Sequence, residues 1–253
     1  MLNKELLSCA LDIGEQMLVS GAEVNRVEDS ISRICKAYDA KRVDVFTITS
    51  SIVVTLQMNN GNTLTQTRRI SKYYIDIDKL DKLNNLSRYI CAHKPDAAYI
   101  GAEMEKINDR RPYSPLIQYL VYAVIAGSFT IFFGGDLSDA AVSAVIGLLL
   151  KFAITFIQKV DKNKVFVNIL CSFVVGVLGV LLVRSGVGHN LDAIIVGNIM
   201  LLIPGLALTN SIRDIISEEI IAGLLRLCEA ILVAISISVG FALASVFFGG
   251  LLI

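Results

Sequence analysis

The chain has 253 residues and a formal net charge of zero at pH 7, and 54% of its residues are hydrophobic. Soluble domains average roughly 45–50% apolar residues, so a mean hydropathy of +0.64 is too high for an ordinary soluble domain. The balanced charge gives no electrostatic reason to expect nucleic-acid binding. Five scattered cysteines, none in a C-x-x-C pair, are interpreted as reduced thiols rather than disulfides or zinc ligands.

Charge and hydropathy divide the chain at Pro112. Most charged residues precede it, and nearly all long apolar runs follow it. We therefore expect a cytoplasmic α+β domain in residues 1–111 and a five-span transmembrane domain in residues 112–253. Acidic residues occur early and no long apolar run opens the chain, so a cleaved secretion signal is not expected.

The N-terminal part is expected to contain two helices, a small sheet of about three strands, and two more helices. "LLSCALDIGEQML" is typical of a helix, and apolar residues then recur at 24, 27, 31, 34 and 38, which is helical spacing. β-branched residues in "RVDVFTITSSIVVTLQM", the turn "NNG" and the segment "NTLTQTRRI" predict the strands. Residues 76–93 and 96–109 return to helical spacing.

The polar stretch "SGAEVNRVED", residues 20–29, is either a functional site or the start of a helix. Ser20 followed by Glu23 matches a capping box, in which each side chain satisfies a free backbone N–H at the helix start. Gly21 permits a sharp change of direction. A solvated helix face is one interpretation of this domain's polar residues, and a ligand site or protein contact is the other. The candidates for the second are Glu23, Arg26, Glu28, Arg68 and Arg69.

The motifs of common enzyme classes are absent from the sequence. There is no G-x-S-x-G elbow, no phosphate-binding G-x-x-x-x-G-K-[ST] loop, and no Cys/His pattern with metal-ligand spacing. We expect no catalytic residue, cofactor or metal.

Five runs after Pro112 reach or approach the roughly 20 apolar residues that a helix needs to cross a bilayer. The predicted spans cover residues 115–135, 138–159, 165–184, 191–210 and 220–252. The loop after the second span carries Lys159, Lys162 and Lys164, the loop before that span carries no basic residue, and Arg110–Arg111 precede the first span. This alternation predicts a cytoplasmic N-terminus and an outside C-terminus in the cytoplasmic (inner) membrane.

The fourth predicted span carries the polar features most typical of a transport path. Pro204 and Gly205 interrupt an apolar run, and proline both removes a backbone hydrogen bond and clashes with the preceding turn. Transporters use such breaks to aim helix ends at substrates or ions; a simple proline kink is the alternative. Asn198 lies two turns before the break, and Asn210 follows it.

Other polar residues of the apolar half have their own interpretations. Lys151 either reaches the cytoplasmic interface or acts in substrate binding or gating. Asn168 is expected to make a helix–helix hydrogen bond. Glu229 either pairs with Arg226 at i, i+3 spacing or relays protons.

Three stretches carry a family resemblance: "SGAEVNRVEDSISRI", "TRRI" and "PGLALTNSIRDIISEEIIAGLLRLCEA". In order and spacing they resemble the threonine/serine exporter family over essentially the whole chain. The resemblance implies a cytoplasmic domain before five spans and export of small amino acids or related carboxylates, such as threonine, serine or succinate. Because the sequence ends after its fifth span, the resemblance also implies the larger subunit of a two-gene form. A smaller membrane protein would then complete the hetero-oligomer.

A transport mechanism follows as a hypothesis. The break at Pro204–Gly205 would present backbone N–H groups to a substrate carboxylate, with Asn198 and Asn210 as further donors. Arg213 or Lys151 would supply a counter-charge, and Asp214 or Glu229 would couple protons. A membrane-anchored ligand sensor is the main alternative, and a membrane-embedded hydrolase is another.

Overall fold

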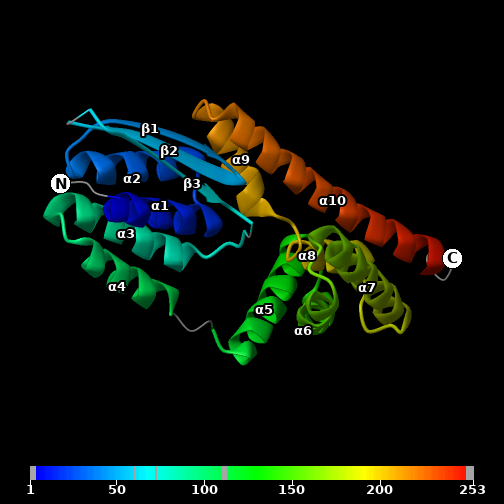
Figure 1. The fold of residues 1–253 in the computed structure, drawn as a ribbon. Coiled ribbons are helices and arrows are strands. Elements are labelled where there is room, and N and C mark those ends of the chain that lie inside the picture. Colours follow the sequence, from blue (N-terminus) through cyan, green and yellow to red (C-terminus); the bar gives the residue numbers. More distant parts are fainter. Residues whose placement is uncertain (1–3, 60, 72, 110–112, 249–253) are drawn as a thin grey trace. The chain divides into compact units, whose positions relative to one another are not determined.

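The computed structural model describes residues 4–59, 61–71, 73–109 and 113–248, and these fall into two compact units (Figure 1). The N-terminal unit comprises Met1–Arg111 and Gly205–Cys228, and the membrane unit comprises Pro112–Pro204 and Glu229–Ile253. One boundary coincides with the composition change at Pro112. Residues 205–228, by contrast, fold with the N-terminal residues. Arg110–Arg111 and the end of the fifth predicted span lie outside the described residues.

The predicted order of elements in the N-terminal part is confirmed. It contains α1 (Lys4–Val19), α2 (Val24–Ala37), β1 (Ala40–Ile48), β2 (Ser51–Met58), β3 (Thr63–Arg69), α3 (Ile77–His93) and α4 (Ala97–Asn108). Along α2, the predicted apolar positions Val24, Val27, Ile31 and Ile34 are all buried, as their helical spacing requires.

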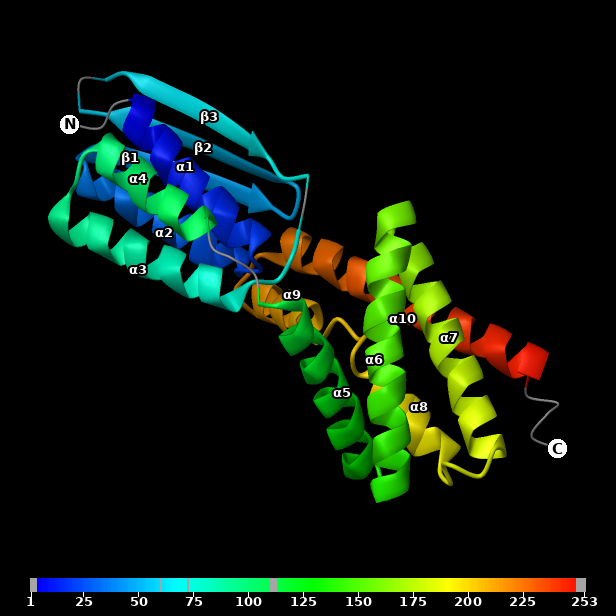
Figure 2. The same cartoon turned by 90° about the horizontal axis from the view of Figure 1, so that it is seen from below.

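The sheet is antiparallel with strand order β1-β2-β3. Val54 of β2 pairs with Val45 of β1 and with Gln66 of β3. Ile52, Val54 and Leu56 are fully buried while the residues between them are not, which is the two-residue period of a sheet with one face covered. Helices α1 and α2 cover that face, and α3 and α4 lie on their far side (Figures 1 and 2).

Four helices, not five, are long and apolar enough to cross a membrane within the described residues: α5 (Pro115–Phe132), α6 (Leu137–Val160), α7 (Lys164–Arg184) and α10 (Ile220–Phe248). The fourth predicted span is two short helices, α8 (Leu191–Ile199) and α9 (Gly205–Ile216). Nine residues of α8 reach only about 14 Å, half of a bilayer core. The predicted break is confirmed, and residues 191–210 are therefore not one continuous helix of membrane length.

Two features, one at Pro204 and one after it, explain why α8 and α9 are separate helices. Proline cannot donate the backbone hydrogen bond that would continue α8, and residues 200–204 are not helical. Beyond the break, Asn210, Ser211 and Asp214 are buried on one face of α9. Such a face needs polar partners, which lipid cannot supply.

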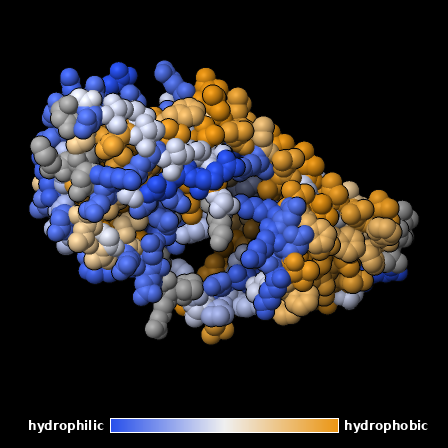
Figure 3. Space-filling view, viewed as in Figure 1, coloured by the Kyte–Doolittle hydropathy of each residue, from blue (hydrophilic) through white to orange (hydrophobic). Residues whose placement is uncertain are grey.

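Small residues let the helices of the membrane unit approach closely. A Cβ at Gly147 of α6 would lie 2.8 Å from the Tyr122 backbone oxygen of α5, and one at Gly197 of α8 would lie 2.1 Å from Thr130 Oγ1. Thr130 also donates a 2.6 Å hydrogen bond to Ser143 Oγ. Glycine contacts and interhelical hydroxyl bonds of this kind drive helix association in lipid. The outer surface of these helices is largely hydrophobic (Figure 3).

Candidate functional site

Residues 21–24, where the turn between α1 and α2 leads into α2, are each bonded to the segment 205–228. Gly21 adopts a φ of +99°, a left-handed conformation that favours glycine. Its carbonyl accepts a 2.8 Å hydrogen bond from Asn210 Nδ2, and the next carbonyl, of Ala22, accepts a 2.9 Å bond from Arg226 Nη2. Two side chains that lie 189 and 204 positions downstream therefore hold the backbone of this turn.

Helix α2 is capped from outside its own sequence. The Val24 N–H donates a 3.0 Å hydrogen bond to Asp214 Oδ1. Its N-cap residue, Glu23, makes no side-chain capping bond. A carboxylate at a helix N-terminus satisfies a free N–H and interacts favourably with the helix dipole. Asp214 therefore performs the capping role that the sequence assigned to Ser20.

The predicted capping box is thus wrong. Ser20 is fully buried, and its hydroxyl has no hydrogen-bond partner among the described residues. Its carbonyl instead accepts a 3.1 Å bond from the Asp76 N–H. The side chain is turned inward because Gly21 redirects the chain before α2 begins, so Ser20 cannot reach the first turn of the helix.

Asp214 and Arg226 form a buried ion pair. Arg226 Nη1 lies 2.9 Å from Asp214 Oδ2, and the two side chains are 2% (Arg226) and 0% (Asp214) exposed. Arg226 also lies over the Tyr73 ring, 5.8 Å from its centroid. Burial raises the pKa of the Asp214 carboxyl, while the Arg226 guanidinium and the Val24 N–H oppose that rise. Arg226 does not pair with Glu229 as predicted; Glu229 is exposed on α10.

Arg213 and Glu23 form the outer edge of this network. Arg213 Nη1 donates to Glu23 Oε1, and their side chains are 57% and 21% exposed. Gly21, Ala22, Glu23 and Val24 are thus each bonded to a different residue of the 205–228 segment. We call this set of eight residues the junction: Gly21, Ala22, Glu23, Val24, Asn210, Arg213, Asp214 and Arg226.

Glu28 lies one turn further along α2, beside the junction. Its pKa is raised from 4.5 to about 7, chiefly by burial and then by the nearby Glu219 carboxylate, while hydrogen bonding with Thr47 opposes the rise. Glu219 belongs to the turn between α9 and α10. The carboxyl of Glu28 therefore changes charge near neutral pH.

Glu28→Gln is expected to flatten the pH dependence of stability. An acid with a raised pKa in the folded state stabilises the fold fully below its unfolded pKa of 4.5, and that contribution is lost as pH rises through about 7. The thermal midpoint of the wild-type chain in detergent should fall between about pH 5 and pH 8 by more than that of the variant. Glu105→Gln, which alters an exposed carboxylate on α4, should retain the wild-type slope. If the thermal midpoint depends on pH equally in all three proteins, the raised pKa of Glu28 is contradicted.

The remaining polar candidates of this unit are Arg68, Arg69 and Arg26. Arg68 Nη2 donates to Asp12 Oδ1 at 2.9 Å and to Ser8 Oγ at 2.7 Å, which ties β3 to α1. Arg69 and Arg26 are exposed. Arg68 is thus held against α1, whereas Arg69 is exposed.

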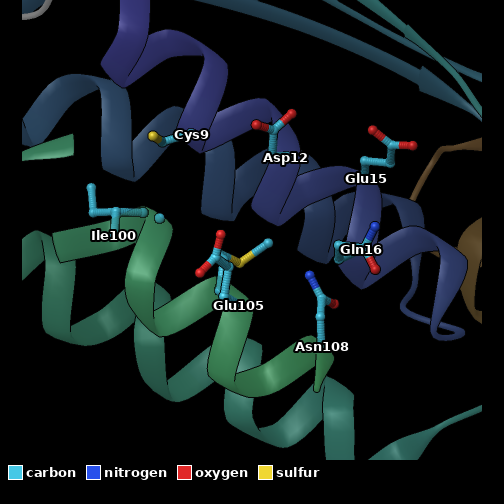
Figure 4. A pocket seen from close by; sticks show the side chains of 9 residues that line it. Cys9, Asp12, Glu15, Gln16, Ile100, Glu105 and Asn108 are labelled. Carbon is cyan, nitrogen blue, oxygen red and sulfur yellow. The ribbon is translucent and has the colours of Figure 1, made fainter. Parts of the chain in front are cut away.

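A cavity of about 320 Å³ lies between α1 and α4. Figure 4 shows side chains from both helices facing it, with Asp12 and Glu15 on α1 and Glu105 and Asn108 on α4. Arg68 already neutralises part of this acidic wall, because it lies 2.9 Å from Asp12 and 3.8 Å from Glu15.

In the membrane unit, ligand atoms of Asp136, Asp139 and His189 lie within 4.8 Å of one another. Their bonds account for this arrangement. Asp136 and Asp139 form the capping box at the start of α6, and Asp139 Oδ1 accepts the N–H groups of His189 and Asn190 at 2.7 and 3.1 Å. The α5–α6 and α7–α8 loops, predicted to lie on one side of the membrane, are thus tied together.

The other predicted transport residues lie in different surroundings. Asn198 is fully buried in the membrane unit; its Nδ2 donates to the Ile194 carbonyl, while its Oδ1 has no partner among the described residues. Lys151 Nζ lies 5.2 Å from the centre of the Tyr122 ring. Gly205 begins α9, and a Cβ there would meet no atom within 4 Å. Pro204 ends the break just before it.

The sequence singled out four members of the junction but not their pairing. Glu23, Asn210, Arg213 and Asp214 were candidates for two separate sites, and pairing with Arg226 was one of two alternatives for Glu229. One signal was available: Asp214 and Arg226 are 12 residues apart around "SEE", a spacing that lets two helices of a hairpin face each other.

Two of the three stretches that carry the family resemblance, residues 20–34 and 204–230, meet at the junction. A model of the family described as "Putative threonine/serine exporter" (ThrE) matches residues 8–248, which include both sides of the junction and the four membrane-length helices of the described residues. No curated protein and no solved structure matches the chain. On the strength of a match over nearly its whole length, the chain belongs to the threonine/serine exporter family.

Proposed function

We propose that this protein is the larger subunit of a secondary transporter that exports small amino acids or related small carboxylates across the cytoplasmic membrane. Family membership over residues 8–248 supports export as the activity. The observation that carries the proposal is the interrupted helix: residues 200–204 separate α8 from α9 in a region that is otherwise built from membrane-length helices.

The chain on each side of the break carries a group that supports the proposed carboxylate path. It is preceded by Asn198, a buried amide with an unpaired oxygen among the described residues. It is followed by the open N-terminus of α9 at Gly205, where an added Cβ would meet no atom within 4 Å. Free N–H groups at a helix start favour an anion. Lys151 and Glu229 remain candidates for counter-charge and proton relay.

Arg213, Asp214 and Asn210 have a different role in this proposal. They hold the α1–α2 turn, so we assign them to coupling rather than to direct contact with the substrate.

A cytoplasmic N-terminal domain and a smaller membrane partner complete the proposal. Lys159, Lys162 and Lys164 cluster at the α6–α7 loop, and basic loops favour the cytoplasmic side. The partner, and the choice among threonine, serine and dicarboxylates such as succinate, rest on what the resemblance to this family implies.

Efflux from preloaded cells tests the proposal. Cells loaded with labelled threonine, serine or succinate would carry this chain, its smaller partner, or both. Efflux only from the pair is the expected result, and the labelled compound that leaves identifies the substrate class. If the proteins reach the membrane and no combination exports, the proposed transport function is wrong.

Pro204→Ala is expected to lower export while the protein still inserts. Alanine restores the missing backbone donor and lets α8 and α9 join, and a barrier change of about 1.4 kcal/mol already slows a rate about tenfold. Pro115→Ala is the matched control, because Pro115 occupies the first turn of α5, where its missing N–H costs no helical bond. Full export by Pro204→Ala would rule out the broken-helix path.

A membrane-anchored sensor is the second candidate, and the cavity between α1 and α4 is the observation that favours it. The efflux experiment separates the two, because a sensor exports nothing in any combination. If the protein is a sensor, substitution of Asp12 or Glu105 in the cavity is expected to alter the binding of a small molecule by the N-terminal domain.

A further inference from the structure

We propose that the N-terminal domain and the 205–228 segment move as one body during export, and that Glu23 and Arg213 are positioning residues that transmit this movement into α10. This inference rests on the proposed function. It assigns a mechanical role to the N-terminal domain, which family membership does not specify.

Backbone groups of neighbouring residues in the α1–α2 turn are hydrogen-bonded to the 205–228 segment. Three backbone groups, the carbonyls of Gly21 and Ala22 and the N–H of Val24, are each bonded to a side chain of the segment. Ala222 of α10 is 1% exposed and belongs to the hydrophobic core of the N-terminal domain. Buried polar bonds and a shared apolar core together resist sliding, because every displacement leaves buried groups unsatisfied.

Within the 205–228 segment, α9 and the start of α10 pack closely against each other. A Cβ at Gly223 would lie 2.6 Å from Ile215 and 2.8 Å from the Ser211 carbonyl, so α9 and the start of α10 are in close backbone contact. The Glu219 N–H donates a 2.9 Å bond to the Asp214 carbonyl, which closes the turn. The Asp214–Arg226 ion pair links the same two helices from the buried side.

Helix α10 continues without interruption from Ile220 to Phe248. Its 29 residues correspond to about 44 Å, and its hydropathy marks it as a membrane-length helix. A helix without proline curves gently along its length rather than ending at a sharp break, and α10 contains no proline. In this proposal, movement of its first two turns with the N-terminal domain is carried into the rest of the helix.

Among the charged members of the junction, Glu23 and Arg213 are the two that we expect to tolerate a change of charge without unfolding. The Arg213 and Glu23 side chains are partly exposed, at 57% and 21%, and exposed pairs contribute little to stability. The Asp214–Arg226 pair is buried, so its removal would destabilise the fold and obscure an effect on transport.

Charge reversal at this pair tests the proposal in the full chain, co-expressed with its partner and assayed for efflux. The variants are Glu23→Arg, Arg213→Glu, and the two together; Asp29→Arg with Arg33→Asp reverses an exposed pair on α2 as the matched control. We expect each single reversal to lower the maximal efflux rate per folded molecule about tenfold, within the usual range of coupling between sites. The half-saturating substrate concentration should not change. The double reversal should restore the rate, and the control should export like wild type.

Amide hydrogen exchange of residues 20–27 supplies a readout that does not depend on transport. Exchange should accelerate in the single reversals and return to the wild-type rate in the double variant. Wild-type efflux from the single reversals would overturn the proposal, as would restored exchange without restored efflux in the double variant. A wild-type pair that exports nothing would overturn the proposed function, and this inference with it.

Discussion

Arg226→Leu is expected to cost the folded protein about 3–5 kcal/mol, the usual penalty for removing one partner of a buried ion pair. The substitution leaves the Asp214 carboxylate without its cation in a site where its side chain is 0% exposed. It also removes the donor to the Ala22 carbonyl. The chain has no tryptophan, so unfolding would be followed by circular dichroism in detergent.

Two controls distinguish the effect of breaking the buried ion pair from the effect of losing any arginine. Arg33→Leu removes one partner of an exposed i, i+4 pair on α2 and should cost no more than about 0.5 kcal/mol. Asp214→Asn keeps an oxygen for the Val24 N–H but leaves Arg226 unpaired, so it should be nearly as harmful as Arg226→Leu. Equal stability of Arg226→Leu and Arg33→Leu would show that the ion pair does not hold the junction.

Gly240→Ala is expected to disrupt the crossing of α7 and α10 in the membrane unit. A Cβ at Gly240 would lie 2.0 Å from Ser172 Oγ and 2.3 Å from the Ile169 backbone oxygen. The serine side chain can rotate away, but the backbone carbonyl cannot, so the two helices must separate. Overpacking of this kind typically costs about 1–3 kcal/mol, and we expect the upper part of that range or more. Thermal stability in detergent measures it.

Gly101→Ala is the matched control for this overpacking. A Cβ at Gly101 of α4 meets no atom within 4 Å, and alanine in a helix is favoured over glycine by about 0.5–1 kcal/mol, so this variant should be slightly stabilised. Adding Ser172→Gly to Gly240→Ala should rescue stability only in part, because the Ile169 carbonyl remains. Full rescue by Ser172→Gly would mean that the hydroxyl, not the backbone, limits the approach of the helices.

Local patterns in the sequence determined much of the secondary structure of this protein. The spacing of Val24, Val27, Ile31 and Ile34 placed α2 and its buried face, because helical geometry puts such residues on one stripe. Turn residues and β-branched runs placed the three strands. Pro204 marked the break between α8 and α9, since a missing backbone donor acts within one turn of helix.

Only the tertiary structure decided how these elements are bonded. Ser20 and Glu23 have the spacing of a capping box, yet α2 is capped by Asp214, 190 residues downstream. Arg226 could pair with Glu229 by helical spacing, yet it turns to Asp214 across the α9–α10 hairpin. In each case the pairing predicted from local spacing is replaced by a buried pairing with a distant residue. An unpaired polar group costs far more free energy when it is buried than when water solvates it. The sequence thus determined that "SGAEVNRVED" begins a helix, and the tertiary structure decided that this turn is held by the segment that leads into α10.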